Sequence, residues 1–542
     1  MTRVRAAGDA ALLLESAGHR PATLAAAVTS AALPGVLDVI PGAATVLVTF
    51  QPGLADQDQL ADVLERLPVS AQLPGRPQPP VEIDVCYDGP DLADVAALTG
   101  LPAGEVIARH RAGRYEVGWL GFAPGFPYLT GLDPALAAVP RLDTPRLAVP
   151  AGAVAIAAGL AAVYPAASPG GWRIIGHTSA RLWDLDREPP ALLAPGREVR
   201  FRAVGALAPT SPPPQAASDP APTADRGLTP TAGRGLTVLQ PGPLTTVQDL
   251  GRPGFGHLGV PRSGAADIGS LRRANELAGN VAGLACLEVT FGRLGVRFDS
   301  AALVAVTGAP APIEVTGPDG DRRQPAAGTA FEVAAGSVLR LGAPRAGLRS
   351  YLAVDGGFDL RPVLGSRSAD LRSGLGPEPL RAGQRLPLSS RPSGARSQDR
   401  PTSVTAGRHY LPPSGHVAAS AGRLPGPGEV AELRIRPGPR EDWFAPGALA
   451  VLTGALYRVT PASDRTGLRL TGPPVARASP AELPSEGVAA GSLQISHDGQ
   501  PILLLADHPV TGGYPVIAVV RAADLGTAAH LRPGPQVRFR PT

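Results

Sequence analysis

A chain of 542 residues is too long for one hydrophobic core, and at about 150 residues per domain it predicts three to four domains. Its 44% hydrophobic and 18% charged residues are ordinary for a soluble protein, and no apolar run approaches the roughly 18–20 residues of a membrane-spanning helix. The formal net charge is only +4, without a basic block interleaved with aromatic residues, which argues against nucleic-acid binding.

The sequence contains no lysine, so all 50 basic residues are arginine. This excludes a Walker A loop, whose lysine contacts the phosphates. It also excludes a Schiff-base lysine and covalent biotin, because both need an ε-amine. Any biotin used in the chemistry must therefore be carried by a partner protein.

The N-terminal stretch MTRVRAAGDAALLLE lacks the cleavage pattern of a signal peptide, so we expect a cytoplasmic protein. The two cysteines, Cys86 and Cys286, lie 200 positions apart and neither belongs to a CxxC motif. They fit buried thiols in a reducing compartment better than a disulfide or a zinc site.

Short β-branched runs between many Gly and Pro residues predict a strand-rich fold. The clearest are ATVLVTF (44–50), VEIDVCY (81–87), ALVAVTG (302–308), PILLLAD (501–507) and PVIAVV (515–520). Helical patterns occur at QDQLADVLERL (57–67), LADVAALTG (92–100) and ADIGSLRRANELAGN (266–280). Residues 205–234 predict a Pro/Ala-rich linker, and residues 381–428 predict a low-complexity surface insert.

An internal repeat is the strongest sign of domain organisation. LAPGREVRFR (193–202) matches LRPGPQVRFR (531–540), and PAGAVAI (150–156) matches AAGSLQI (489–495). Between these segments the first half carries SPGGW (168–172) and the second carries VTGGY (510–514). Each half is therefore expected to contain one copy of the same β-rich domain.

Other motifs have plain structural explanations. GFGHLG (254–259) fits GxGxxG, but no buried strand precedes it and Pro261 follows where a helix should begin, so a dinucleotide site is not expected. The nine histidines are scattered, and no metal site is expected. Asp498-Gly499, between two strand-like runs, is typical of a hairpin turn.

Candidate site residues lie in loops rich in Gly, Pro and aromatic residues. Loop packing, a surface ion pair or turn capping are the structural alternatives for them. The candidate catalytic residues are Asp464, Asp507 and Arg465. The candidate substrate-binding residues are Gly125, Phe126, Tyr128, Ser168, Gly170, Gly171, Trp172, Ser485, Glu486, Gln494, Thr511, Gly512, Gly513 and Tyr514.

Long segments resemble one known family. YEVGWLGFAPGFPYLTGLDP and VYPAASPGGWRIIGHT resemble the first subunit of the bacterial 5-oxoprolinase and allophanate-hydrolase-related carboxyltransferase family. GPLTTVQDLGRPGFGHLGVPRSGAAD, LGSRSADLR, SDRTG and ADHPVTGGYPVIAVV are similar to its second subunit. The resemblance implies that both subunits are fused through the proline-rich linker.

The resemblance implies a mainly β fold with some α-helix (α+β), with two cyclophilin-like β-barrel domains, each beside a smaller accessory α/β domain. The first half would comprise a small α/β domain at 1–79 and a cyclophilin-like domain at 80–204. After the linker, the second half would comprise residues 235–380 and, beyond the insert, a cyclophilin-like segment at 429–542.

Two chemistries follow from the resemblance. In one, the chain acts with a separate catalytic subunit as a 5-oxoprolinase that opens the lactam of 5-oxoproline to glutamate, with ATP bound through the complex. In the other, it is the carboxyltransferase of a urea-carboxylase-type enzyme, with a biotin carboxylase and carrier protein as partners. A third alternative, a kinase-regulating protein-binding module, is disfavoured because fusion of inhibitor and antagonist works against independent control.

The sequence departs from the family pattern at Leu160 and Val510, where the subunits usually carry Gly-Gln-Thr-Gly and Asp-Arg-Gln-Thr segments, so the substrate stays open. Our hypothesis is that the two Gly-Gly loops face one cleft, because glycine backbone can approach an amide closely. Trp172 and Tyr514 would stack on the flat substrate, Asp464 or Asp507 would handle the amide proton, and Arg465 could assist with phosphate.

Overall fold

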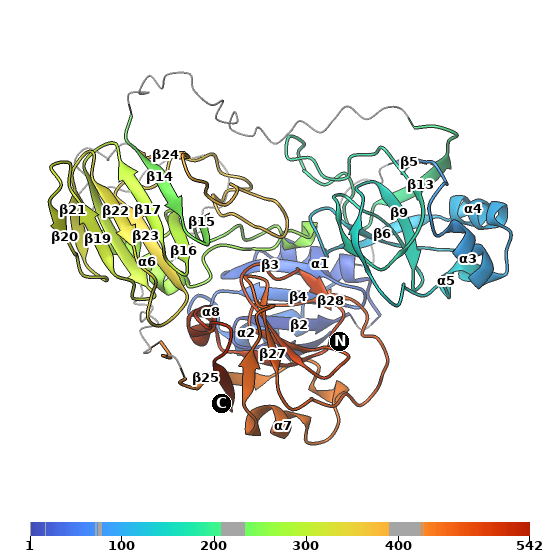
Figure 1. Cartoon of the computed structure of the whole chain (residues 1–542). Helices are drawn as coiled ribbons and strands as arrows, with labels where there is room; N and C mark the ends of the chain where they lie inside the picture. Colours follow the sequence, from blue (N-terminus) through green and yellow to red (C-terminus); the bar gives the residue numbers. More distant parts are fainter. Residues whose placement is uncertain are drawn as a thin grey trace.

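The computed structural model describes residues 2–16, 18–70, 73, 79–207, 233–389, 424–426 and 428–542. Residues 208–232 of the expected linker, and residues 390–423 and 427 of the expected insert, lie outside the described residues. Figure 1 shows four bodies. The N-terminal body (blue) and the C-terminal barrel (orange to red) lie between a first barrel (cyan to teal, right) and a middle β-domain (green to yellow, left).

The first body is an antiparallel sheet with strand order β1-β2-β4-β3, covered by two helices. Leu12 and Leu14 on β2 face the helices, while Leu13 and Leu47 belong to a cluster on the opposite face that includes Val510. The sheet therefore buries both faces. Its elements are β1 (Arg3–Ala6), β2 (Ala11–Glu15), α1 (Pro21–Ser30), β3 (Val36–Pro41), β4 (Thr45–Phe50) and α2 (Gln57–Glu65).

The second body is a seven-stranded sheet of order β12-β9-β10-β7-β6-β13-β5, which an isolated bridge between Cys86 and His177 almost closes into a barrel. Val154 and Ile156 of β9 face its core, whereas Ala155 and Ala157 face an aromatic cluster outside it. Its elements are β5 (Val81–Val85), α3 (Leu92–Thr99), α4 (Ala103–Ala112), β6 (Tyr115–Leu120), β7 (Pro127–Thr130), α5 (Pro134–Ala137), β8 (Arg146–Val149), β9 (Ala153–Ala157), β10 (Leu160–Val163), β11 (Ser168–Gly170), β12 (Arg173–His177) and β13 (Glu198–Ala203).

The third body, the middle β-domain, consists of two sheets of order β20-β19-β22-β17-β14-β24 and β15-β16-β23-β18-β21. One helix, α6, packs on Ala305 and Tyr351 of the five-stranded sheet, so this body has more sheet than the expected α/β accessory domain. Its elements are β14 (Gly235–Pro241), β15 (Leu244–Gln248), η1 (Gly256–Leu258), α6 (Ile268–Leu277), β16 (Cys286–Thr290), β17 (Leu294–Phe298), β18 (Ala302–Gly308), β19 (Ile313–Thr316), β20 (Arg322–Arg323), β21 (Ala330–Val333), β22 (Val338–Leu341), β23 (Arg349–Val354) and β24 (Arg385–Pro387).

Strand β24 lies within the segment expected as a surface insert. It pairs with β14, and Leu386 is buried in the core of the middle β-domain. The expectation is therefore wrong for residues 385–387, because an apolar side chain and a free strand edge fix this short segment.

The fourth body is a closed barrel of order β25-β32-β29-β30-β27-β26-β33. Its core includes Leu433, Leu493 and Phe539. Its elements are β25 (Ala431–Pro437), η2 (Glu441–Trp443), α7 (Ala448–Gly454), β26 (Tyr457–Val459), β27 (Gly467–Thr471), β28 (Glu486–Gly487), β29 (Ser492–Ile495), β30 (Pro501–Leu504), β31 (Thr511–Gly512), β32 (Val516–Val520), η3 (Ala522–Asp524), α8 (Leu525–Ala529) and β33 (Gln536–Pro541).

The internal repeat is confirmed as a shared topology. Strands β5, β6, β7, β9, β10, β12 and β13 have the same neighbours as β25, β26, β27, β29, β30, β32 and β33. The last strand runs parallel to the first in both barrels. Each Gly-Gly segment also forms a short antiparallel ladder, β11 with β8 and β31 with β28.

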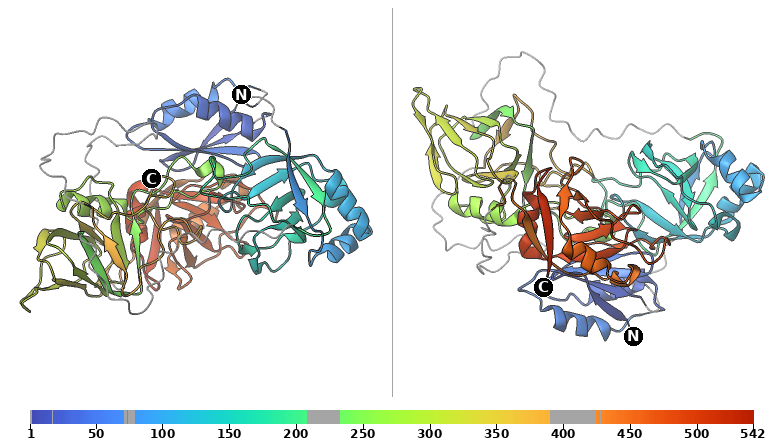
Figure 2. Two further views of the ribbon diagram at one scale, coloured as in Figure 1. Left: turned by 90° about the horizontal axis from the view of Figure 1, so that it is seen from above. Right: turned by 60° about the horizontal axis from the view of Figure 1, so that its bottom comes forward.

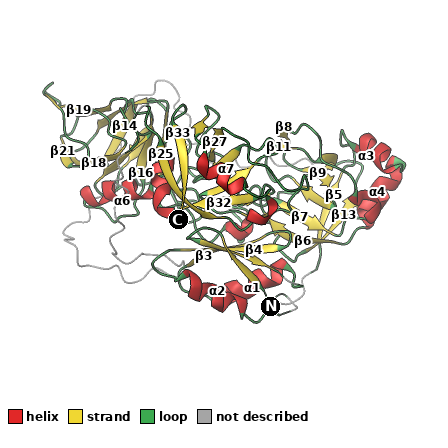
Figure 3. Cartoon of the chain, turned by 90° about the horizontal axis from the view of Figure 1, so that it is seen from below, coloured by secondary structure: helices red, strands yellow, loops and turns green. Residues whose placement is uncertain are grey.

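The two halves interlock, because the first body packs on the second barrel (Figure 2). The backbone amide of Ala43 donates to the carbonyl of Ser485 at 2.7 Å, and Arg440 pairs with Glu15 at 2.9 Å. Helices α1 and α2 cover the sheet face that points away from the barrel (Figure 3). Among the described residues, no helix is both long and apolar enough to cross a membrane.

Asp38 joins the first body to the middle β-domain, and its burial predicts a pH effect. Its Oδ1 accepts hydrogen bonds from the backbone amides of Gly254 and Gly256 at 2.8 and 2.9 Å. Burial raises the pKa of Asp38 from 3.8 to about 6, against the opposing effects of these amides and of Arg262. The folded chain therefore keeps a proton that the unfolded chain has released, so stability falls as the pH rises through this interval.

We expect Asp38→Asn to remove this fall, because the asparagine oxygen can accept the same two hydrogen bonds without a buried charge. Relative to Asp38→Asn, the wild-type chain should lose about 3 kcal/mol between roughly pH 4 and pH 7. Thermal unfolding midpoints across this range measure the effect, with the exposed Asp62→Asn as the matched control. Parallel pH profiles for all three proteins would contradict the prediction.

Candidate active site

A cluster of aromatic side chains from β6, β7 and neighbouring loops covers the outer face of the first barrel. Phe126, Tyr128 and Trp172 are at most 8% exposed and pack against one another with Trp119 and Tyr164. The Trp119 and Tyr128 rings stack at 4.5 Å, and Trp172 meets the edges of Phe126 and Tyr128 at 6.0 and 5.8 Å. The structure therefore uses the predicted stacking residue Trp172 for packing, and its contact with a substrate stays a prediction.

The first glycine of each Gly-Gly pair packs closely against a side chain, and the contact is tighter at Gly170 than at Gly512. A Cβ on Gly170 would lie 2.2 Å from the Tyr164 hydroxyl, and one on Gly512 would lie 2.8 Å from Nε2 of Gln494. Gln494 donates to the carbonyl of Tyr514 at 3.1 Å, which holds the second loop against its barrel. Of the two cavities described below, neither is lined by these glycines.

The two halves meet where the aromatic cluster reaches the second Gly-Gly loop. The hydroxyl of Thr511 accepts a hydrogen bond from the backbone amide of Phe122 at 3.2 Å. A Cβ on Gly121 would lie 2.2 Å from the same hydroxyl, so the contact requires glycine there. Burial raises the pKa of Tyr128, against the smaller opposing effects of nearby groups that include the side chains of Ser485 and Thr511. Predicted residues of both halves thus lie together at this junction.

A buried ion network joins the second barrel to the middle β-domain. The Arg465 guanidinium, 4% exposed, donates to Asp507 through Nε at 2.8 Å and Nη2 at 3.0 Å. Its Nη1 donates to Glu288 of β16, and Nη2 also donates to the carbonyl of Gly264. Ser263 donates its hydroxyl proton to Asp507 at 2.6 Å. Every nitrogen of Arg465 is therefore engaged, and little capacity is left for a phosphate.

Glu288 is the anion at the centre of this network. Its Oε2 accepts hydrogen bonds from the Tyr351 hydroxyl and the backbone amide of Ala266, both at 2.9 Å. Burial alone would raise the pKa of Glu288, but the charges of Arg465 and Arg349 hold it below its ordinary value. The carboxylate is therefore charged and fixed in place.

A cavity of about 490 Å³ opens above this network, between the second barrel and the middle β-domain. Arg465 and Asp507 lie at its buried end, while the side chains of Asp464 and Arg372 are exposed. The structure thus brings all three predicted catalytic residues into one cavity. Other lining residues include Leu244, Phe291, Leu348, Arg349 and Pro461.

Asp464 and Arg372 are the accessible charged pair of this cavity. Oδ1 of Asp464 accepts from the backbone amides of Thr466 and Gly467 at 2.7 and 3.2 Å, which fixes the side chain in a turn. Arg372 lies over the Phe122 ring, with its guanidinium carbon 5.4 Å from the ring centre, and donates to the Phe122 carbonyl at 3.2 Å. The cavity therefore offers a positioned acceptor and a positioned cationic donor.

Asp370 adds a second carboxyl group near the network. Its Oδ1 accepts from the backbone amides of Arg372 and Ser373, whereas its buried Oδ2 has no hydrogen-bond partner among the described residues. Burial, and then the charge of Asp507, raise the pKa of Asp370. A carboxyl group with a raised pKa holds its proton more tightly than an exposed aspartic acid does.

The other predicted residues lie farther from this cavity's lining. Glu486 is buried and accepts from Arg440 Nε at 2.9 Å, which favours the structural alternative for it. Tyr514 packs edge-on against His497 at 5.3 Å. Gly125 donates its amide proton to the Leu258 carbonyl at 2.9 Å, and Ser168 pairs with Val149 in the short ladder. Among the described residues, the nearest non-adjacent atoms to a Cβ on Gly171 and on Gly513 lie at 3.6 and 3.4 Å.

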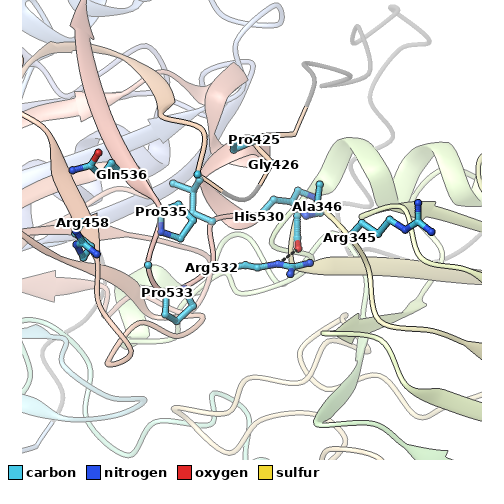
Figure 4. Close-up of a pocket in the computed structure, with 14 residues that line it drawn as sticks. Arg345, Ala346, Pro425, Gly426, Arg458, His530, Arg532, Pro533, Pro535 and Gln536 are labelled. Carbon is cyan, nitrogen blue, oxygen red and sulfur yellow. Dashed lines mark hydrogen bonds between the residues drawn. The ribbon is translucent and has the colours of Figure 1, made fainter.

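A second cavity of about 340 Å³ shares Leu531 and Pro533 with the first. Arg345 and Arg458 extend on opposite sides of it (Figure 4). Arg532 turns toward the middle β-domain, where it donates to the carbonyls of Gly347 and Pro344. Its arginines do not converge on one point, so it is a weaker candidate for a specific site.

Sequence reasoning missed Arg372, Asp370, Glu288 and Ser263. Ser263, Asp370 and Arg372 lie in segments that carry the family resemblance, and none of the four residues stands beside Asp464 in the chain. Asp370 and Arg372 belong to LGSRSADLR, whose polar content was the available signal. Glu288 lies inside an apolar strand. A charged residue in a buried strand indicates that an oppositely charged group pairs with it.

Comparison with known proteins agrees with the two-part architecture. The family described as carboxyltransferase domain, subdomain A and B, matches residues 258–541, and subdomain C and D matches residues 2–193. The C subunit of 5-oxoprolinase from Escherichia coli K12 is 34% identical over 304 residues, which cover 56% of this chain and 89% of that protein. The B subunit of 5-oxoprolinase from Escherichia coli O157:H7 is 44% identical over 176 residues, covering 31% and 78%.

One further similarity covers nearly the whole chain, and another covers about half of it. The crystal structure of TTHA0988 superimposes with a TM-score of 0.80 at 35% identity and covers 99% of this chain and 100% of that one. Urea amidolyase of Saccharomyces cerevisiae is 29% identical over 318 residues, which cover 56% of this chain but 16% of that protein. This chain belongs to the carboxyltransferase-domain family and joins a half related to the B subunit of 5-oxoprolinase to a half related to the C subunit.

Proposed function

We propose that this chain is the fused B and C component of an ATP-dependent 5-oxoprolinase. In this function it opens the lactam of 5-oxoproline to glutamate together with a separate catalytic subunit. The relatives named as the B and C subunits of 5-oxoprolinase support the assignment, and they are themselves parts of a larger enzyme by name. The observation that carries it is the cavity in which Asp464 and Arg372 present an acceptor and a cationic donor.

The substrate matches this pair chemically. 5-Oxoproline presents a lactam N–H, a lactam carbonyl and a carboxylate. Asp464 would accept a hydrogen bond from the lactam N–H and later take the lactam proton or return it. Arg372 would bind the substrate carboxylate. Asp507 orients Arg465 and does not contact the substrate in this proposal, because its oxygens already accept from Arg465 and Ser263. The buried network then serves as a rigid floor for the cavity.

ATP supplies the free energy for opening the amide. The cavity offers ATP few contacts. Only Arg372 among the arginines that line it is exposed, because Arg465 and Arg349 are buried and pair with Glu288. A triphosphate needs several accessible cationic or amide donors. We therefore assign nucleotide binding to the complex with the partner subunit.

The test is to purify the chain with its partner subunit and to follow glutamate formation from 5-oxoproline. Glutamate is expected only when ATP, this chain and the partner are all present. ATP-dependent carboxylation of urea, without turnover of 5-oxoproline, would replace the proposal by the alternative below. Glutamate formation by the partner subunit alone would show that this chain is not needed for the reaction and would contradict the proposal.

The alternative is the carboxyltransferase component of a urea-carboxylase-type enzyme. The similarity to urea amidolyase favours it, although the chain spans a small part of that protein. Because the chain has no lysine, carboxybiotin would have to arrive on a separate carrier protein. Incubation with a carboxylated carrier and urea, with and without the chain, distinguishes the two functions.

A further inference from the structure

Three metal-binding side chains meet at the seam of the first barrel, on residues that the proposed function does not use. Cys86 follows β5, His177 ends β12, and Asp88 lies in the loop that leaves the seam. The Cys86 sulfur, an Asp88 carboxylate oxygen and a His177 ring nitrogen all lie within 4.8 Å of one another. These three types of donor are the common ligands of zinc.

The backbone holds two of the donors in fixed register. Cys86 and His177 form an isolated antiparallel bridge, in which each amide donates to the other's carbonyl at 2.9 Å. Nδ1 of His177 also donates to Oδ1 of Asp88 at 2.6 Å. The side chains of His177 and Asp88 are exposed, and Cys86 is half-buried, so a solvated ion can reach all three.

The loop after Cys86 is anchored to the neighbouring strand. The amide of Gly89 donates to the carbonyl of Ile175 at 3.2 Å, and a Cβ on Gly89 would lie 2.3 Å from the backbone of that residue. Asp91, two residues farther on, accepts from the amide of Ile174 at 2.7 Å and pairs with Arg146. Because the loop is anchored, ordering Asp88 around an ion would cost little conformational entropy.

The second barrel shows that the seam itself does not require these residues. Its equivalent pair is Arg436 and Val519, which occupy the same places in the register of β25 and β32. Gly438 donates to the carbonyl of Ile517 as Gly89 donates to Ile175. One residue separates Arg436 from Gly438, whereas two separate Cys86 from Gly89, so the loop of the first barrel is one residue longer.

We propose that Cys86, Asp88 and His177 bind one divalent cation with zinc-like preference for sulfur and nitrogen, leaving the fourth position to water. Binding breaks the hydrogen bond between His177 and Asp88. The Cys86 thiol releases its proton to solvent, and neutral His177 changes to the tautomer that carries its proton on Nε2. The freed Nδ1 lone pair and one Asp88 oxygen then complete the protein ligands. Ligand atoms of a tetrahedral zinc site lie about 3.2–3.8 Å apart, which small side-chain rotations reach from the observed spacing.

Such an ion would join β5 and β12, the two edge strands of a barrel that is otherwise closed by one backbone bridge. It would therefore stabilise the first barrel in proportion to its occupancy. The corresponding seam of the second barrel has three paired positions and no comparable ligand set at its equivalent residues.

The test uses the full chain without an affinity tag, titrated first with Co²⁺ and then with Zn²⁺. A thiolate bound to Co²⁺ gives a near-ultraviolet charge-transfer band, and the chain contains only two cysteines. One equivalent of Co²⁺ should produce this band, and Zn²⁺ should remove it and raise the thermal midpoint of unfolding. Absence of the band in the wild-type chain would overturn the proposal.

Three variants locate the ion. Cys86→Ser should abolish the band, and His177→Gln should weaken Zn²⁺ binding by at least about 100-fold, since loss of a supporting group alone costs up to about that factor. Cys286→Ser is the matched control and should keep both the band and the affinity, because Cys286 is buried in the middle β-domain. Unchanged Zn²⁺ affinity in Cys86→Ser and His177→Gln would also overturn the proposal, and His177→Gln keeps the test open if Cys86→Ser folds poorly.

Discussion

Arg465→Ala is expected to lower the free energy of unfolding by about 3–5 kcal/mol. The substitution leaves Glu288 and Asp507, which are 1% exposed, without the cation that both of them bind. Asp507 then keeps only the hydrogen bond from Ser263, and Glu288 keeps only Arg349 as a paired cation, among the described side chains. Buried carboxylates with so little compensation must take up protons or admit water, and both cost stability. Because Glu288 belongs to the middle β-domain, the loss should also loosen the contact between this domain and the second barrel.

Chemical denaturation, followed by circular dichroism, measures the effect. The matched control is Arg469→Ala, because Arg469 lies on β27 only four positions away and its side chain is exposed. That control should change stability by less than about 0.5 kcal/mol. Equal stability of Arg465→Ala and Arg469→Ala would show that the network contributes little.

Asp464→Asn is expected to lower kcat of the reconstituted 5-oxoprolinase by about 10²–10⁴-fold. The asparagine oxygen can still accept the amide protons of Thr466 and Gly467, so the turn and the fold should persist. What the substitution removes is the charge and the basicity that the lactam proton requires. The thermal unfolding midpoint should therefore stay within about 2 °C of the wild-type value, as expected for a surface substitution.

Asp498→Asn provides a closely matched control for this experiment. Asp498 is exposed and holds a turn in the same barrel by accepting from the backbone amide of Gln500, but it does not line the cavity. Its variant should turn over at the wild-type rate. If Asp464→Asn did the same, Asp464 would be a turn residue only, and the proton would have to be handled by another group such as Asp370.

Much of the architecture could be predicted because it depends on local pattern. The helices at 57–65, 92–99 and 268–277 and the strands β4, β5, β18, β30 and β32 lie within the segments that periodicity indicated. The repeat was visible because equivalent strands keep similar residues at a nearly constant spacing. Strand β24 was missed because it depends little on local pattern. It has three residues among polar neighbours, which carry too little local signal to predict a strand.

The candidate site could be predicted only in part. Asp464, Arg465 and Asp507 were identified because they flank strands of the repeated barrel and stand in recognisable motifs. Their separate functions were not visible. Asp464 and Arg465 are neighbours in the chain, yet one is exposed at the cavity and the other is buried between two carboxylates. The difference arises because Arg465 faces the middle β-domain at this strand end, whereas Asp464 faces the cavity.

The sequence by itself determined the strand-rich character of the fold, the duplication of the barrel, the family and the absence of lysine chemistry. These properties follow from composition and from contacts between residues close in the chain. Only the tertiary structure decided that Glu288 pairs with Arg465 across 177 positions, that Gly121 is shaped to receive Thr511, and that Cys86, Asp88 and His177 share one seam. Pairings at such separations depend on how whole bodies pack, and a residue's own neighbours in the sequence carry no record of them.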